Sequence, residues 1–356
     1  MARSRQNPEV RDFILRNLRA HPGDIAAVTA ARYGLSRPAV AGYIRRLVNE
    51  GLVDATGATR DRRYNARDLV SLDFDVRLTA DVSEDAVWQG KILPHIENIP
   101  ENIINICQYG FTEMFNNTID HSASFFAAVR YRQTYRHINI QVSDSGVGIF
   151  HKLQSQFHLH DPRQALLELS KGRLTSDPSH HTGHGIFFTS RMFDEFSIYS
   201  GNLFYNRIRQ EDDDWLIESR DLPENVSGTW VEMTISTNAT WTTRDIFDRY
   251  QDDPVGFKRT HVPIALGKYP GEQLVSRSQA KRVLARVDRF SEVLLDFQGV
   301  QDIGPAFADE IFRVFKNAHP DISILASRAN ARITRMIKAA SEAQASPPPP
   351  DQPSFL

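Results

Sequence analysis

The sequence of 356 residues is 41% apolar, carries a formal net charge of −2 and contains one cysteine, Cys107. This length allows two or three domains, and the apolar content argues against general disorder. A single cysteine excludes an intrachain disulfide and a cysteine-based zinc site within one chain. No segment has the roughly eighteen uncharged apolar residues of a membrane span or the apolar core of a secretory signal, so we expect a cytoplasmic protein without membrane association.

The first segment, residues 1–68, differs in charge from the rest of the chain. Its first 66 residues contain twelve Arg and six acidic side chains, whereas the remainder has thirty basic and thirty-eight acidic side chains. Apolar periodicity, capping residues and Gly34 predict three helices and then a basic hairpin: residues 8–20, 24–33, 36–50 and 51–64. The apolar stripe of the third helix faces inward, which leaves arginines on its outer face.

This order resembles a winged helix-turn-helix, in which the third helix enters the major groove of DNA and the wing holds the backbone. The resemblance implies that six arginines of the third helix and the hairpin contact DNA: Arg37, Arg45, Arg46, Arg60, Arg62 and Arg63. A module of the same fold that docks a protein or dimerises is the alternative. The excess of positive charge favours DNA.

Residues 73–236 are expected to form an α+β region around a long helix over residues 100–121. On this helix Glu113 and Asn117 lie one turn apart, so both side chains can point into one pocket. An amide oxygen can ligate a hard cation such as Mg²⁺, and a carboxylate can take a proton from water or a hydroxyl group. Polar residues on an exposed helix face are common, so this pair needs the support of other motifs.

A first glycine turn follows an alternating strand over residues 137–143. The strand delivers Asp144 to a turn that contains Gly146 and Gly148. The carboxylate can accept a hydrogen bond from the exocyclic amine of adenine, and the two glycines let the backbone approach the ring.

A second glycine pair, Gly183 and Gly185 with His184 between them, precedes a predicted helix over residues 187–193. Backbone N–H groups at the start of a helix form an anion site that suits a triphosphate. Further on, Thr229 begins a strand predicted over residues 230–235.

In this order the motifs resemble the GHKL family, to which gyrase, histidine-kinase and mismatch-repair ATPases belong. The resemblance implies a GHKL α/β sandwich that binds ATP and Mg²⁺, with Asn117 as the metal ligand, Asp144 at the adenine and Thr229 near it. It also implies a mobile lid over residues 150–181, with three candidate phosphate contacts: Lys171, Arg173 and Thr175. A domain without a nucleotide, in which the glycines occur by chance, is the alternative.

Four histidines near these motifs could suggest a metal cluster: His121, His180, His181 and His184. They lack acidic or cysteine partners at ligand spacing. We therefore expect them to serve in backbone loops or to face solvent.

The C-terminal third is predicted to contain a turn-rich linker, 237–258, a small α/β domain, 259–341, and a disordered Pro-rich tail, 342–356. Three strands and three helices are expected to alternate in the domain: strands 262–266, 293–297 and 322–326, and helices 279–290, 305–317 and from 329 onward. Residues 293–308 resemble a STAS-like domain, the fold of anti-anti-sigma factors. The three regions together predict an α+β multidomain protein.

The fate of the γ-phosphate stays open between hydrolysis, transfer to a protein and binding alone. Glu113 can act as a general base in either of the first two, and its surroundings most resemble those of anti-sigma-factor serine kinases. In the STAS-like resemblance the acceptor serine lies where this chain has Gly304, Pro305 and Ala306, which offer no hydroxyl group. Ser276 or Ser278 could replace it, although a serine before a helix is more often an N-cap.

These features predict a homodimeric regulator in which ATP binding is coupled to a winged-helix domain that binds DNA. The STAS-like domain then serves as a platform for a protein partner or for dimerisation. The main alternative is a Ser/Thr kinase or partner-switching protein of a sigma-factor circuit, with the winged segment used for docking. A defence or stress effector with a sensory ATPase is a third class.

Overall fold

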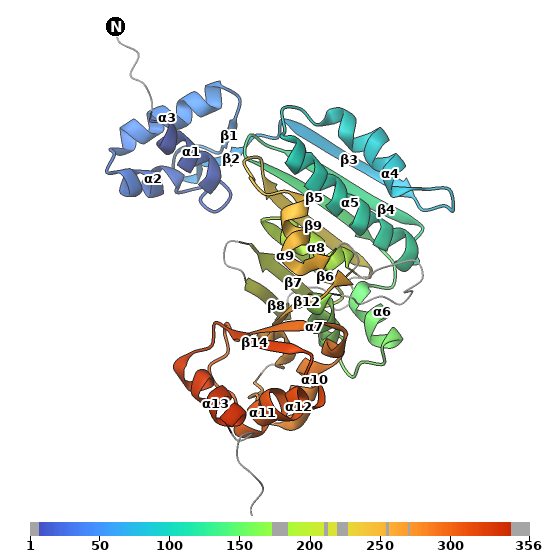
Figure 1. Ribbon diagram of the computed structural model, residues 1–356. Coiled ribbons are helices and arrows are strands. Elements are labelled where there is room, and N and C mark those ends of the chain that lie inside the picture. The colour runs from blue at the N-terminus through green and yellow to red at the C-terminus, as the bar shows by residue number, and fades with distance from the viewer. Residues whose placement is uncertain are drawn as a thin grey trace, which may run out of the picture. The chain divides into compact units, whose positions relative to one another are not determined.

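The computed structural model describes residues 7–172, 184–209, 213–218, 227–253, 256–269 and 271–342, and it is of mixed α/β class, as predicted (Figure 1). The chain divides into two compact units. The first consists of Met1–Gly146, Phe193–Phe196 and Trp230–Thr242, and the second of Val147–Met192, Ser197–Thr229 and Thr243–Leu356. Among the described helices, none combines the length and the apolar character needed to cross a membrane.

The first unit begins with three helices and a hairpin, as predicted: α1 (Pro8–Asn17), α2 (Ile25–Tyr33), α3 (Arg37–Asn49), β1 (Val53–Thr56) and β2 (Arg63–Ala66). Apolar side chains of the helices and of β1 form one buried cluster. Ser36 caps α3 by accepting a hydrogen bond from Ala39 N. Asp24 is the N-cap residue of α2, but its side chain makes no capping bond, and its carboxylate lies 3.1 Å from His21 Nδ1.

The central part of the first unit is an antiparallel sheet covered on one face by a long helix, α5 (Glu101–His121) (Figure 1). Its neighbouring strands are, in order, β3 (Val70–Arg77), β4 (Phe126–Gln133), β5 (His137–Asp144) and β9 (Thr229–Ser236). A short helix, α4 (Glu84–Val87), and a π-helical turn precede α5. Gly110 lets α5 approach the sheet closely, because a Cβ there would lie 2.4 Å from the Phe193 ring.

The buried face of α5 begins at Ile103 and Ile106, whereas Ile104 is only half-buried. The buried stripe of α5 passes through Gly110. A pattern made of large apolar residues cannot include a glycine, so the pattern does not identify this position of the helix as buried.

The second unit contains further strands and helices of the α/β region: β6 (Glu195–Ser200), whose first two residues belong to the first unit, β7 (Leu203–Ile208), β8 (Asp213–Glu218), α6 (Ile149–Gln156), α7 (Arg163–Lys171) and α8 (Gly185–Met192). The strands follow the order β6-β7-β8. The predicted helix over 187–193 corresponds to α8. Helices α6 and α7 lie in the stretch that the GHKL resemblance assigned to the lid.

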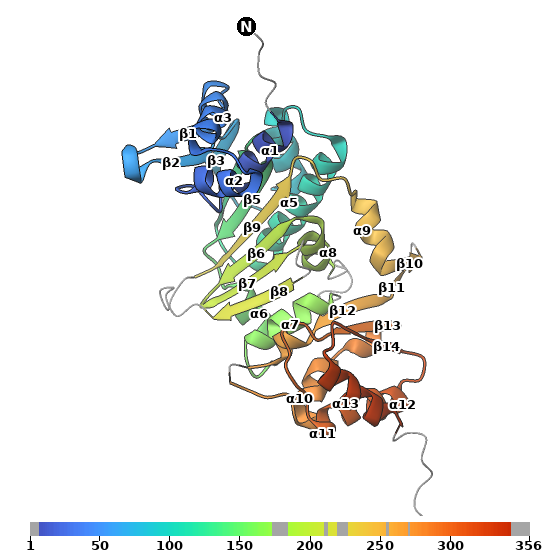
Figure 2. The same cartoon turned by 90° about the vertical axis from the view of Figure 1, so that its left-hand side faces the viewer.

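The C-terminal part of the second unit is a parallel sheet of the order β12-β13-β14 (Figure 2). Strands and helices alternate as predicted: β12 (Arg259–Pro263), α10 (Arg277–Leu284), β13 (Glu292–Asp296), α11 (Pro305–Asp309), α12 (Lys316–Ala318), β14 (Ser323–Ser327) and α13 (Ala331–Glu342). A π-helical stretch joins α11 to α12. The first strand begins three residues before its predicted start, and it ends at Pro263 because Ile264–Gly267 form a 3₁₀ turn.

The stretch predicted to be a turn-rich linker contains a helix, α9 (Thr243–Tyr250), and two short strands, β10 (Gln251–Asp253) and β11 (Gly256–Phe257). The α9 side chains pack on α8, with ring centroids 4.8 Å apart for Phe247 and Phe188 and 5.0 Å apart for Tyr250 and Phe187. Helices this short gain most of their stability from such tertiary packing, which the local sequence does not reveal.

Candidate functional site

Helix α5 carries the predicted pair Glu113 and Asn117, and both side chains are half-buried. Tyr109, one turn earlier, donates a hydrogen bond to the Glu113 carboxylate, and burial together with this carboxylate raises the pKa of the phenol. No partner for the Asn117 amide occurs among the described residues. Because asparagine disfavours helix interiors, an unpaired amide at this position suits a ligand better than a structural role.

Tyr109 was not predicted from the sequence. Its spacing of four residues from Glu113 is the signal that could have identified it, because i and i+4 side chains meet on a helix. The hydroxyl fixes the orientation of the carboxylate without neutralising it.

The first glycine turn lies against the end of α5 in the first unit. Gly146 N donates to Asp144 Oδ1 at 2.9 Å, and Asp144 itself is half-buried. A Cβ on Gly146 would lie 1.9 Å from the backbone oxygen of Ser122, the C-cap residue of α5. This contact excludes any side chain at Gly146 and places the turn that carries Asp144 beside the helix that carries Glu113 and Asn117.

The remainder of this turn belongs to the second unit, where the residue after it is hydrogen-bonded to Thr229. Gly148 has a positive φ of 76°, and a Cβ there would lie 2.7 Å from Ser200 Oγ and 3.2 Å from Gly228 O. Directly after it, Ile149 N donates to Thr229 Oγ1 at 3.0 Å. Two motifs eighty residues apart in sequence therefore meet within this unit.

Ser200 supports this arrangement and was also missed by sequence reasoning. Its hydroxyl donates to Gly228 O at 2.8 Å, which fixes the residue before Thr229. A serine at the end of a strand carries no distinctive sequence signal.

Of the second glycine motif, His184 and Gly185 lie at the start of α8, and His184 O accepts the hydrogen bond from Phe188 N. Five further predicted positions lie outside the described residues: Arg173, Thr175, His180, His181 and Gly183.

Lys171, the predicted phosphate contact, is buried in the second unit. Its ammonium lies 2.8 Å from Glu168 Oε1 and donates to Ala285 O at 2.7 Å. Burial lowers its pKa, and the Glu168 carboxylate opposes that shift. A contact between Lys171 and phosphate thus stays a prediction, and it requires these bonds to break.

The described part of the chain contains no group of three or more His, Cys, Asp or Glu side chains placed to hold a metal ion. The oxygen donors that fit a hard cation are those of α5, Asn117 and Glu113. A site built from one or two protein oxygens and nucleotide phosphates is the usual arrangement for Mg²⁺.

Arginines of the N-terminal segment fall into two sets. Arg11, Arg16 and Arg67 each pair with a carboxylate of the same segment. The predicted DNA contacts on α3 and the hairpin are exposed, and within the described residues none of these five pairs with a carboxylate: Arg37, Arg45, Arg46, Arg62 and Arg63. The side chain of Arg60 lies outside the described residues. Apart from Arg32 on α2, the arginines of this segment that lack a carboxylate partner among the described residues therefore lie on α3 and the hairpin.

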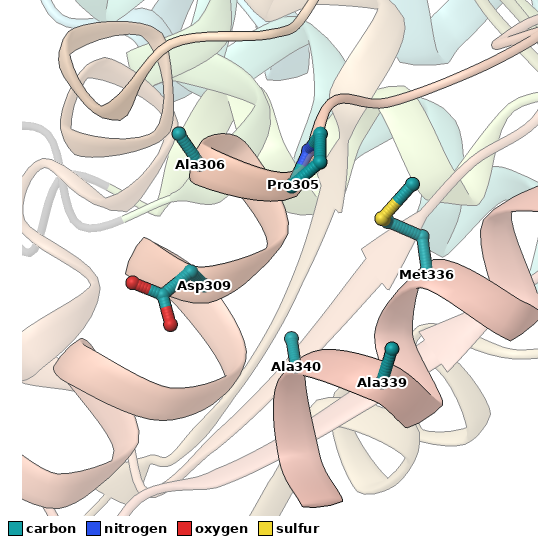
Figure 3. A pocket seen from close by; sticks show the side chains of 6 residues that line it. All are labelled: Pro305, Ala306, Asp309, Met336, Ala339 and Ala340. Carbon is teal, nitrogen blue, oxygen red and sulfur yellow. The ribbon is translucent and has the colours of Figure 1, made fainter. Parts of the chain in front are cut away.

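In the C-terminal domain a pocket of about 360 Å³ lies between α11 and α13 (Figure 3). Six residues line it: Pro305, Ala306, Asp309, Met336, Ala339 and Ala340. None of these side chains carries a hydroxyl group, so the pocket offers no phosphate acceptor where the STAS-like resemblance would place one.

A comparison with protein families matches residues 279–332 to a STAS-like domain of unknown function (DUF4325). The match runs from α10 to the start of α13, and it confirms the predicted STAS-like domain in this part of the chain. No curated protein matches the chain.

Proposed function

We propose that this chain is an ATP-binding regulatory protein. The observation that carries the proposal is the position of the first glycine turn: Gly146 packs on the carbonyl oxygen of Ser122, so the turn that carries Asp144 lies against the end of the helix that carries Glu113 and Asn117. A carboxylate at this place can accept a hydrogen bond from the amine of a base. The hydrogen bond from Ile149 N to Thr229 Oγ1 joins a second predicted nucleotide residue to the same turn.

The other predicted residues complete the nucleotide site. Asn117 would hold Mg²⁺, which would neutralise phosphate charge. The start of α8, where His184 and Gly185 lie, would receive the phosphates on its backbone N–H groups. Glu113, oriented by Tyr109, accepts a proton from water or a hydroxyl group, so the same geometry serves hydrolysis or transfer.

We further propose that the N-terminal segment binds DNA as a winged helix-turn-helix and that nucleotide binding regulates it, in a homodimer. The separation of paired from unpaired arginines supports this role, because exposed arginines without carboxylate partners are free to neutralise DNA phosphates. Solvated arginines of a protein-docking module are the competing interpretation.

The alternative function, a Ser/Thr kinase or partner-switching protein, is favoured by the STAS-like match, and the Tyr109–Glu113 pair is compatible with it. The absence of hydroxyl groups in the pocket at Pro305 argues against phosphorylation of this domain there. A kinase of this type then acts on another protein or on Ser276 or Ser278, of which Ser276 caps α10.

The nucleotide chemistry is tested with ATP labelled on the γ-phosphate. Label on a protein indicates a kinase, free labelled phosphate an ATPase, and bound, intact ATP a ligand switch. Glu113→Gln should abolish turnover and spare binding, and retained turnover would refute the proton-acceptor role.

DNA binding is tested by replacing Arg45 and Arg46 with Ala and measuring affinity for duplex DNA across a salt series. Loss of two phosphate contacts should weaken binding and reduce its salt dependence. Arg16→Ala is the matched control, because Arg16 is already paired with Asp12 at 2.8 Å. Equal losses of DNA affinity in the two variants would argue against DNA binding by this surface.

A further inference from the structure

Helix α7 is held in the second unit by the C-terminal domain at its last turn. Five residues make this contact: Glu168, Lys171, Thr260, Ala285 and Arg286. We call this group the latch. Arg286 Nη1 lies 3.2 Å from Glu168 Oε2, and Lys171 Nζ donates to Ala285 O at 2.7 Å. The Thr260 hydroxyl, on β12, donates to Lys171 O at 2.7 Å.

The latch is buried at its centre. The side chains of Lys171 and Glu168 are 1% and 5% exposed, and every residue of α7 from Ala165 onward is buried. Away from the latch, Gln164 Nε2 donates to Tyr269 OH at 2.8 Å. The contact is therefore built from specific polar bonds along the helix and not from apolar packing alone.

Arg286 occupies a strained position within the latch. Its φ of 59° lies in the left-handed region, which costs free energy for a side chain other than glycine. Its guanidinium also lies 4.6 Å from the Phe157 ring centroid, after the end of α6. A strained backbone that presents an ion-pair partner is typical of a functional constraint.

Helix α7 is also bonded to α8, the helix that follows the second glycine pair. Arg191 is buried, and its Nη2 donates to Ser170 O at 3.3 Å. Bonds thus run from β12 and the residues after α10, through α7, to α8. Any displacement of α7 must break bonds at one of these ends.

We propose that the C-terminal domain restrains α7 through the latch and so competes with nucleotide phosphate for Lys171. This inference rests on the proposed nucleotide function, since Lys171 cannot hold Glu168 and Ala285 and reach a phosphate at the same time. Binding free energies are reciprocal, so a partner that loosens the latch raises ATP affinity and ATP in turn loosens the latch.

The test uses the full chain and two latch variants that leave Lys171 in place. Arg286→Gly removes the ion pair and relieves the positive φ, and Thr260→Val removes one hydrogen bond with little change of shape. Arg332→Ala is the control, because Arg332 forms an exposed pair with Asp302 in the same domain. Hydrogen exchange of α7 amides and affinities for Mg·ATP and for AMP are measured.

Both latch variants should speed exchange in α7 and tighten ATP binding by about threefold to tenfold, which corresponds to up to about 1.4 kcal/mol. AMP affinity should not change, because AMP lacks the outer phosphates. Unchanged ATP affinity in both variants, with ATP still bound by the wild type, would overturn the competition. If neither ATP nor AMP binds the wild type, the proposed nucleotide function fails. Unchanged hydrogen exchange of the α7 amides in both variants would separately overturn the restraint of α7 by the latch.

Discussion

The N-terminal segment and the C-terminal domain are each attached to the α/β region of their own unit, and the attachments differ in burial. Arg19, after α1, lies 2.8 Å from Glu195 Oε2 with its side chain 65% exposed. Lys171 in the latch is 1% exposed. Exposed ion pairs are weak and screened by salt, whereas breaking a buried pair is costly. The first attachment combines the exposed Arg19 pair with a less exposed pair between Asp12 and Arg136, whereas the latch is buried at its centre.

Breaking the latch should produce the largest effect on stability. Glu168→Gln leaves the Lys171 ammonium buried without a counter-charge, and we expect the second unit to lose about 4 kcal/mol of unfolding free energy. Glu342→Gln, in an exposed pair with Lys338, is the control and should change little. The measurement is denaturant unfolding, and similar losses in both variants would contradict the distinction between buried and exposed attachments.

The double change Glu168→Leu with Lys171→Met sharpens this prediction. Apolar replacement of both partners in a buried pair is often neutral for stability. Recovery of stability together with loss of ATP affinity would separate the packing role of Lys171 from its phosphate role.

The next largest effect is expected at the first glycine turn. Gly146→Ala forces a Cβ to 1.9 Å from the Ser122 oxygen, so the turn must shift, at a cost of about 3 kcal/mol. Nothing lies within 4 Å of a Cβ at Gly90, which lies in the π-helical turn of the first unit, so Gly90→Ala is the control. Thermal unfolding and ATP titration should show losses for the first variant alone. Normal ATP binding by Gly146→Ala would contradict the proposed site.

The free energy of unfolding is expected to depend on pH through His137, which lies near the N-terminal attachment. Burial, together with Arg19 and Arg136, lowers the pKa of His137 from 6.5 to about 4. The unfolded chain then binds more protons, so stability is full above pH 6.5 and falls as the pH drops toward 4, by about 2 kcal/mol near pH 5. His137→Gln should flatten the pH dependence of thermal unfolding. An equal flattening in the exposed control His95→Gln would exclude His137 as the cause of the pH dependence.

The smallest effect is expected from the exposed pairs themselves. Arg19→Ala removes contacts with Glu195 and Glu232 and should cost no more than about 1 kcal/mol, with the loss vanishing at high salt. Unfolding measured at low and high salt gives the difference. A large, salt-independent loss would show that the N-terminal attachment is held like the latch.

Local pattern predicted the elements that carry the site. The helix with Glu113 and Asn117 and the strand that ends at Asp144 follow from apolar periodicity, which reports burial directly. Helix α9 was missed because its stability depends on Phe187 and Phe188, more than fifty residues earlier. The surroundings of Lys171 were missed for the same reason, since Ala285 and Arg286 lie more than a hundred residues away.

The central claim is that the chain binds ATP through Asp144 and Asn117. Calorimetric titration of the full chain with Mg·ATP tests it directly, with Asp144→Asn and Asn117→Ala as the variants and Gly90→Ala as the control. We expect saturable binding by the wild type and the control, a loss for all adenine nucleotides in Asp144→Asn, and a loss of the magnesium dependence in Asn117→Ala. Absence of binding by the wild type, or unchanged affinity in both variants, would contradict the claim.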